Sequence, residues 1–184
     1  VAAIESLLGL LFFALATGLL YGRFSKPISK IKFSEKAVIA PYRDINGFMF
    51  RLVNPQKNEL LEVEINVSVS MKRDNSELRD FHILELERDS VRFFPSMWTV
   101  VHPIEENSPL FGLNQRDYNK KDIEFITTLK AFDESSGQMV YSRSSYKPEE
   151  IEWGQKFVYT VQKRNGKILV DVGKINESES AMLN

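Results

Sequence analysis

The chain has 184 residues, enough for one ordinary domain and a short additional element. It contains no cysteine, which excludes disulfides and thiolate zinc sites, and its net charge of −1 does not indicate a nucleic-acid partner. The charges are distributed unevenly, because Glu5 is the one charged residue among the first 22 and the remainder is richly charged.

Residues 1–23 have the length and composition of a membrane-spanning helix. Residues 6–22 carry no charge, and about 22 helical residues reach roughly 33 Å, the thickness of a hydrocarbon core. A signal peptide would place its positive charges before a shorter apolar stretch, and a core helix of a soluble domain would show a polar face. We therefore expect a span, with a buried soluble helix and a processing signal as the alternatives.

A run of basic residues follows the span and predicts its orientation. Glu35 is the one acidic residue within the run, so the positive-inside bias makes the C-terminal side cytoplasmic. We expect residues 24–35 to form a basic interfacial linker that can hold an anionic lipid headgroup, unless these residues only set the topology. The residues expected to meet the lipid are Arg23, Lys26 and Lys30.

Two stripes of residues run along the expected helix. One has small residues four positions apart, which lets another helix approach closely: Ala14, Gly18 and Gly22. The other covers an arc of about 120°: Gly9, Phe13, Thr17 and Tyr21. Glu5 adds a carboxylate at membrane depth, where such groups face a protein interior or an aqueous cavity. Together these features favour a helix packed in a bundle, although small residues are also common in membrane helices.

Residues 36–175 are predicted to form an immunoglobulin-like antiparallel β-sandwich, followed by a polar tail over residues 176–184 that is expected to fray. Apolar and polar residues alternate over residues 61–72, which is typical of a strand with one buried face. Turns are expected at "DING" (44–47), at "DESSG" (133–137) and at Asn165–Gly166, the strongest hairpin signal. The expected strands cover residues 36–42, 47–54, 61–72, 81–87, 97–104, 123–132, 138–146, 156–162 and 167–174.

The sequence contains no catalytic motif of the nucleophile-elbow, Walker, dinucleotide or zinc-protease type. His82 and His102 are twenty residues apart without ligand-like neighbours, so neither is expected to bind a metal. We expect no enzymatic activity and no cofactor. The stretch "MWTVVHPIEENSPLFG" (97–112) combines an aromatic strand, two prolines and an acidic loop, and it is either structural or part of a subunit interface.

Five stretches resemble inward-rectifier potassium channels, with the prokaryotic branch the most similar. In chain order they are "TGLLYGRFSKP", "FSEKAVIAPYRDINGFMFRLVN", "WTVVHPIEENSPLFG", "RSSYKPEEIEWGQKFV" and "VDVGKIN". The resemblance implies a homotetramer in which this helix is the inner helix and lines the pore. It also implies passive potassium transport and a location in the cell membrane, the inner membrane of a bacterium.

The resemblance also assigns roles to single residues. Tyr21 matches the bulky residue at the helix-bundle constriction, Gly9 matches the inner-helix glycine, and Phe13 matches the cavity position that controls rectification. Because strongly rectifying members carry an acid where this chain has Phe13, strong block by polyvalent cations is not expected. Glu62 and Glu150 match positions whose carboxylates line the cytoplasmic pore and concentrate cations there.

The expected partners are identical subunits, membrane lipids and the permeant potassium ion. The family's selectivity filter is not among these residues, so the chain is expected to be a segment of a longer protein. The main alternative is a single-pass anchor carrying an immunoglobulin-like interaction domain without transport. A third possibility is a soluble β-sandwich enzyme or sugar binder whose first helix docks internally.

Overall fold

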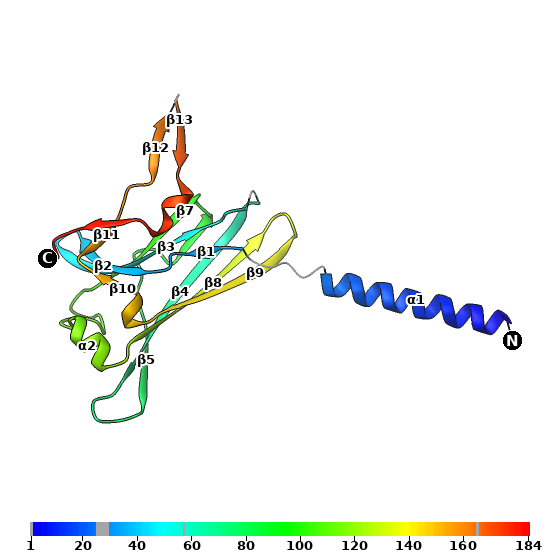
Figure 1. The fold of residues 1–184 in the computed structure, drawn as a ribbon, viewed down its shortest axis with the longest axis horizontal. Helices are drawn as coiled ribbons and strands as arrows, with labels where there is room; N and C mark the ends of the chain where they lie inside the picture. Colours follow the sequence, from blue (N-terminus) through cyan, green and yellow to red (C-terminus); the bar gives the residue numbers. More distant parts are fainter. Residues whose placement is uncertain (1, 25–29, 57, 165) are drawn as a thin grey trace.

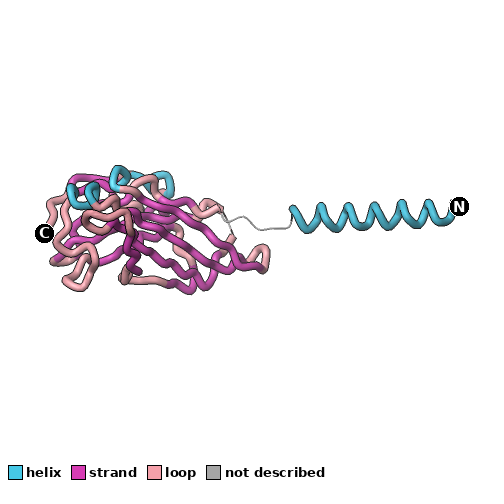
Figure 2. The backbone as a smooth tube through the Cα atoms, turned by 90° about the horizontal axis from the view of Figure 1, so that it is seen from below, coloured by secondary structure: helices cyan, strands magenta, loops and turns pink. Residues whose placement is uncertain are grey.

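The structure, a computed structural model, describes residues 2–24, 30–56, 58–164 and 166–184. It consists of a long helix, α1 (Ala2–Phe24), and a β domain from which the helix projects (Figure 1). Residues Ala2–Gly22 are apolar and long enough to cross a membrane, and their apolar stretch is 0% buried by the rest of the chain. The helix extends away from the strands (Figure 2). The possibility that this helix docks inside a soluble domain is therefore wrong.

The β domain is built from fourteen strands, with one short α-helix, α2 (Gln115–Lys120), and two 3-10 turns, η1 (Pro148–Glu150) and η2 (Val172–Asn176), among the described residues. The strands are β1 (Lys32–Phe33), β2 (Ala37–Tyr42), β3 (Ile45–Val53), β4 (Leu60–Lys72), β5 (Arg79–Ile83), β6 (Ser90–Phe93), β7 (Met97–Pro103), β8 (Glu124–Asp133), β9 (Gln138–Tyr146), β10 (Ile151–Trp153), β11 (Gln155–Phe157), β12 (Val161–Arg164), β13 (Lys167–Val170) and β14 (Ser178–Ser180).

Two five-stranded sheets form the sandwich. The first has the order β1-β3-β2-β10, with β7 added on β3, and the second has the order β5-β4-β8-β9, with β6 added on β4. All pairs are antiparallel except β10 with β2, which is parallel. The expected fold class, a mainly antiparallel β-sandwich preceded by one apolar helix, is confirmed.

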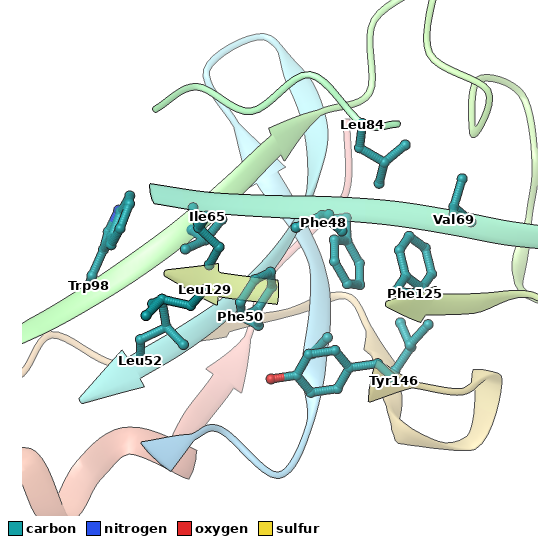
Figure 3. Packing of buried hydrophobic residues seen from close by; sticks show 14 of the residues in the cluster. Phe48, Phe50, Leu52, Ile65, Val69, Leu84, Trp98, Phe125, Leu129 and Tyr146 are labelled. Atoms are coloured by element: carbon teal, nitrogen blue, oxygen red, sulfur yellow. The ribbon is translucent and has the colours of Figure 1, made fainter. Parts of the chain in front are cut away.

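The hydrophobic core lies between the two sheets (Figure 3). Phe48, Phe50 and Leu52 alternate along β3 and are 0% exposed, because every second side chain of a strand points to the same face. The ring of Phe48 stacks on Phe125 of β8 with centroids 3.9 Å apart. Each fully buried side chain of this kind contributes roughly 1.5–3 kcal/mol to folding, so the core holds the two sheets together.

The predicted turn at residues 44–47 is wrong, because the β2–β3 connection is the two-residue turn Arg43–Asp44, with Tyr42 paired to Ile45. Gly47 lies inside β3, where neighbouring groups crowd its Cα. A Cβ there would lie 3.3 Å from the carbonyl oxygen of His102 and 3.2 Å from the Met49 methyl. The glycine serves close packing rather than the turn. The turn at residues 133–137 is confirmed. β12 and β13 pair as the predicted hairpin, with Arg164 opposite Lys167, while Asn165 of the predicted turn lies outside the described residues.

The C-terminal residues, expected to fray, are attached to the domain. β14 pairs with β11, and the side chain of Asn184 donates to the carbonyl oxygens of Ile45 and Arg43 at 2.8 Å and 3.2 Å. The backbone N–H of Asn184 also donates to Asn46 at 3.1 Å. Long-range pairing therefore orders a polar segment whose composition alone predicts disorder.

Arg51 fastens the segment after β10 to the first sheet. Arg51 is 6% exposed. Its guanidinium donates to the carbonyl oxygen of Val158 at 2.5 Å, to that of Lys174 at 3.3 Å and to the hydroxyl of Thr99 at 3.3 Å. The guanidinium also lies 4.7 Å from the centre of the Phe157 ring. Burial lowers the pKa of Arg51, yet these acceptors satisfy the charged group.

Candidate functional site

The residues predicted to line and close a pore lie on α1. Phe13 and Tyr21 are 72% and 76% exposed, so their rings are available for contacts outside this chain. The hydroxyl of Thr17 donates to the carbonyl of Phe13 at 2.8 Å and is satisfied within the helix. Because α1 is continuous, Phe13 and Tyr21 lie about 80° apart around it. Both rings can point toward a common pore axis only if the helix is tilted or curved.

The stripe of Ala14, Gly18 and Gly22 is open within the single chain. An added Cβ at Gly18 or Gly22 would meet no atom within 4 Å, and the same is true at Gly9. Such a surface allows a neighbouring helix to approach closely. The packing role of the stripe remains a prediction.

The basic residues predicted to meet a lipid headgroup lie where the chain enters the β domain. Lys30 is exposed, as is Lys32 at the start of β1. Lys26 and the side chain of Arg23 lie outside the part of the chain that the structure describes. The lipid contact is therefore still a prediction for all three residues.

Glu62 lies at an irregularity of β4. The pairing of β4 with β8 shifts register between Leu61 and Glu64, which is a β-bulge. Glu62 has a φ of 45°, in the left-handed region that costs a non-glycine residue about 1–2 kcal/mol. Its carboxylate is exposed and forms an ion pair with Arg92 of β6 at 3.8 Å. The bulge turns an acidic side chain outward at a strained position.

Glu150, the second acid predicted to line the pathway, lies far from Glu62 within the chain. Leu61 is opposite Phe132 of β8 and Tyr146 is opposite Phe125, so seven residues of β8, roughly 23 Å, separate the two ends of the sheet. Glu150 follows Tyr146 in the turn η1, where its carboxylate accepts the N–H of Lys147 at 2.9 Å. The two acids belong to different ends of the domain.

The described residues include no group of three or more histidine, aspartate or glutamate side chains that could hold a metal ion. A cavity of about 560 Å³ lies elsewhere, between the β2–β3 turn, the β5–β6 loop and the loop after β7. His102 and Ser108 line it, and none of the predicted site residues does. Of the predicted site residues, Glu150 lines a shallow hollow beside Glu35 and Tyr146.

The loop after β7, for which the sequence allows either a structural role or a place in a subunit interface, has a structural role in this chain. His102 is 3% exposed, and its Nδ1 lies 2.6 Å from the carbonyl oxygen of Glu85 while its Nε2 lies 2.8 Å from Ser108 Oγ. A carbonyl only accepts, so Nδ1 carries the proton and donates, and Ser108 donates to Nε2 while accepting the N–H of Leu110 at 3.1 Å. The ring joins three segments in its neutral form.

We expect the stability of the β domain to fall between pH 7 and pH 5 because of His102. Burial lowers the pKa of this ring, whereas Glu85 and Glu105 oppose the shift. The unfolded chain therefore binds more protons than the folded chain in this range, and stability is lost as the pH falls. Thermal unfolding measured across this pH range gives the slope of the unfolding free energy against pH. His102→Gln should reduce this slope by an amount that corresponds to at most one bound proton. His82→Gln, at an exposed ring on β5, is the matched control, and an equal effect of both changes would contradict the assignment.

Residues 31–183 match the protein family described as the inward rectifier potassium channel C-terminal domain. The chain belongs to the inward-rectifier potassium channel family. Among its relatives, the inward rectifier potassium channel Kirbac3.1 of Paramagnetospirillum magnetotacticum is 31% identical over 179 residues, which cover 95% of this chain and 60% of that protein. The prokaryotic branch expected from the sequence is therefore supported.

Animal inward rectifiers are similar to the chain over nearly the same residues. The ATP-sensitive inward rectifier potassium channel 8 of Homo sapiens is 27% identical over 97% of this chain and 44% of its own length. The G protein-activated inward rectifier potassium channel 1 of Bos taurus is 26% identical over 94% of this chain and 36% of its own length. The chain thus spans between about a third and three fifths of the inward rectifiers that it matches.

Among solved structures, the sporulation control protein Spo0M of Bacillus subtilis aligns with 69% of this chain at a TM-score of 0.35 and 11% identity, too low to support an argument. The inward-rectifier domain of this chain covers β1 to β14, and α1 precedes it. The family consists of ion channels, which agrees with the expectation of a protein without enzymatic activity.

Proposed function

We propose that this chain supplies the pore-lining helix and the cytoplasmic gating domain of a tetrameric potassium channel that carries out passive transport. The observation that carries the proposal is the order of the two parts. A fully exposed apolar helix long enough to cross a membrane directly precedes an inward-rectifier C-terminal domain. Such a helix needs either lipid or other helices around it, because water would hydrate its apolar side chains unfavourably.

In this proposal four copies of α1 converge at the cytoplasmic side, and the rings of Tyr21 form the constriction. The open stripe of Ala14, Gly18 and Gly22 packs against a neighbouring helix, which is consistent with the free space at both glycines. Phe13 faces the cavity, and Glu62 and Glu150 line the cytoplasmic pathway at two levels. Movement of the β domain, transmitted through residues 23–33, opens the constriction at Tyr21.

Anionic lipid is the second proposed partner. Lys30 is exposed at the start of the β domain, and Arg23 and Lys26 precede it in sequence, close to the expected end of the span. No cofactor is part of the proposal, and the potassium ion is the transported substrate.

The test is potassium efflux from liposomes that contain the channel expressed from its complete coding sequence. We expect efflux that barium blocks and that liposomes without protein lack. Barium-insensitive or absent efflux from correctly assembled tetramers would contradict the proposal and favour a membrane-anchored interaction domain without transport.

A further inference from the structure

Ser34, near the end of the basic linker, is hydrogen-bonded to both sheets of the sandwich. Its N–H donates to the carbonyl oxygen of Arg51 in β3 at 2.8 Å, and its hydroxyl accepts the N–H of Arg51 at 3.0 Å. The hydroxyl of Tyr146, the last residue of β9, donates to the carbonyl oxygen of Ser34 at 2.9 Å. Ser34 and Tyr146 are 2% and 1% exposed, so water does not compete for these bonds. One residue is thereby fixed to β3 of the first sheet and to β9 of the second.

The core holds the hydroxyl of Tyr146 in place. The Tyr146 ring lies 5.4 Å from the ring of Phe50 and 6.3 Å from that of Phe48, measured between centroids (Figure 3). Burial raises the pKa of Tyr146 to about 12, so the hydroxyl keeps its proton at neutral pH and remains a donor. Because this proton is directed to the Ser34 carbonyl, the Ser34 hydroxyl is the donor in its own 3.4 Å contact with the tyrosine oxygen. The core therefore presents a fixed donor to the end of the linker.

The residues that follow Ser34 are held at the surface. The N–H of Glu35 donates to Asn176 Oδ1 at 2.9 Å, and Lys36 Nζ lies 2.5 Å from Glu152 Oε1. Exposed ion pairs of this kind contribute little to stability. The preceding strand β1 has two residues and lies at the edge of its sheet, so its pairing alone opens at a low cost in free energy. The buried bonds of Ser34 are therefore the firm part of this joint.

We propose that Tyr146 is a positioning residue for the gate, because its hydrogen bond to Ser34 carries movement of the β domain into the linker and so to the constriction at Tyr21. This inference rests on the proposed function. Bonds to β3 alone fix the end of the linker at one edge of one sheet, whereas the bond from β9 keeps that end from turning about the edge. Without the hydroxyl, the end of the linker yields when the domain moves, and part of the displacement is lost before it reaches α1.

The test measures the ratio of open to closed times of single full-length channels in planar bilayers. Tyr146→Phe keeps the ring and removes only the hydroxyl, and it should lower this ratio by about threefold or more, a factor within the range that one hydrogen bond contributes. Tyr118→Phe is the matched control, because Tyr118 is also 1% exposed and its hydroxyl has no hydrogen-bond partner among the described residues. The control should leave the ratio unchanged.

The same change made together with Tyr21→Ala separates positioning from a merely structural role. Once the constriction is removed the linker has nothing to act on, so Tyr146→Phe should no longer alter the ratio. An equal effect with and without Tyr21→Ala, or no effect in either, overturns the role of Tyr146, and the constriction stands if Tyr21→Ala raises the ratio. If Tyr21→Ala itself changes nothing, Tyr21 is not the constriction and both conclusions fall.

Hydrogen exchange of the assembled tetramers tests the joint directly. The backbone amides of residues 30–36 should exchange faster in Tyr146→Phe than in Tyr118→Phe, because the first change loosens Ser34 and the second does not. Equal exchange in the two variants would mean that the hydroxyl of Tyr146 does not hold the linker, and the inference would then be wrong. Size-exclusion chromatography verifies that each variant assembles as the wild type does.

Discussion

Replacing Tyr21 with alanine is expected to raise barium-sensitive potassium efflux from channel-containing liposomes by about tenfold, a shift of roughly 1.4 kcal/mol in the gating equilibrium. Four tyrosine rings meeting at one level of the helix bundle would occlude the pathway and pack against one another when it is closed. Alanine removes both the steric obstruction and the apolar contact, so the open state gains in population.

Phe12→Ala is the matched control for this experiment. Phe12 is 77% exposed, nearly the same as Tyr21 at 76%, and an offset of nine positions places the two rings about 180° apart on the helix. A ring on that side is expected to face lipid, and its loss should leave the open fraction unchanged. Equal efflux from wild type and Tyr21→Ala would remove Tyr21 from the constriction, and a larger effect at Phe12 would reverse the orientation of α1.

Replacing Arg51 with alanine is expected to destabilise the β domain by about 2–4 kcal/mol. The change removes the Arg51 donor from the half-buried carbonyl oxygens of Val158 and Lys174, of which Lys174 keeps the N–H of Glu177. It also removes the cation from the face of Phe157. Arg51→Lys should recover only part of the loss, because one ammonium group does not reproduce the planar set of donors of the guanidinium.

Chemical denaturation of the purified protein in detergent, followed by circular dichroism, measures this loss. Arg88→Ala is the control, because Arg88 is exposed on the β5–β6 loop, and a change within about 0.5 kcal/mol is expected there. A loss at Arg51 no greater than at Arg88 would mean that the segment after β10 does not depend on this contact.

Long periodic segments of the fold were predictable from the sequence, and short ones were not. The alternation over residues 61–72 predicted β4, which spans Leu60–Lys72, because a strand with one wet face imposes a period of two. β1, β10 and β14 have two or three residues each, too few to show any period. β14 consists of polar residues, and its pairing with β11 orders it.

The short helix α2 had a signal that sequence reasoning missed. Asn114 caps its N-terminus and accepts from the N–H groups of Arg116 and Asp117, while the carboxylate of Asp117 accepts the N–H of Asn114. Asn followed by an acid three residues later is a capping pattern that precedes a helix. The helix has six residues, which is why apolar periodicity did not reveal it.

The sequence by itself determined the apolar helix, the basic flank and the alternating strands. These features depend on residues that are close along the chain, and their spacing alone sets which face of an element is apolar. The family match, the expected roles of Tyr21 and Phe13 and the separation of one helix from one β domain were all available at this level.

Only the tertiary structure decided which distant side chains meet. Arg92 is thirty positions after Glu62, and the pairing of β6 with β4, which depends on how β4 packs on the core, brings their side chains to 3.8 Å. Arg51 is buried because the segment after β10 folds back over it, which its own neighbours in sequence do not indicate. Contacts of this kind depend on the whole arrangement of the two sheets, because each strand's register is set by the hydrophobic face that it shares with the others.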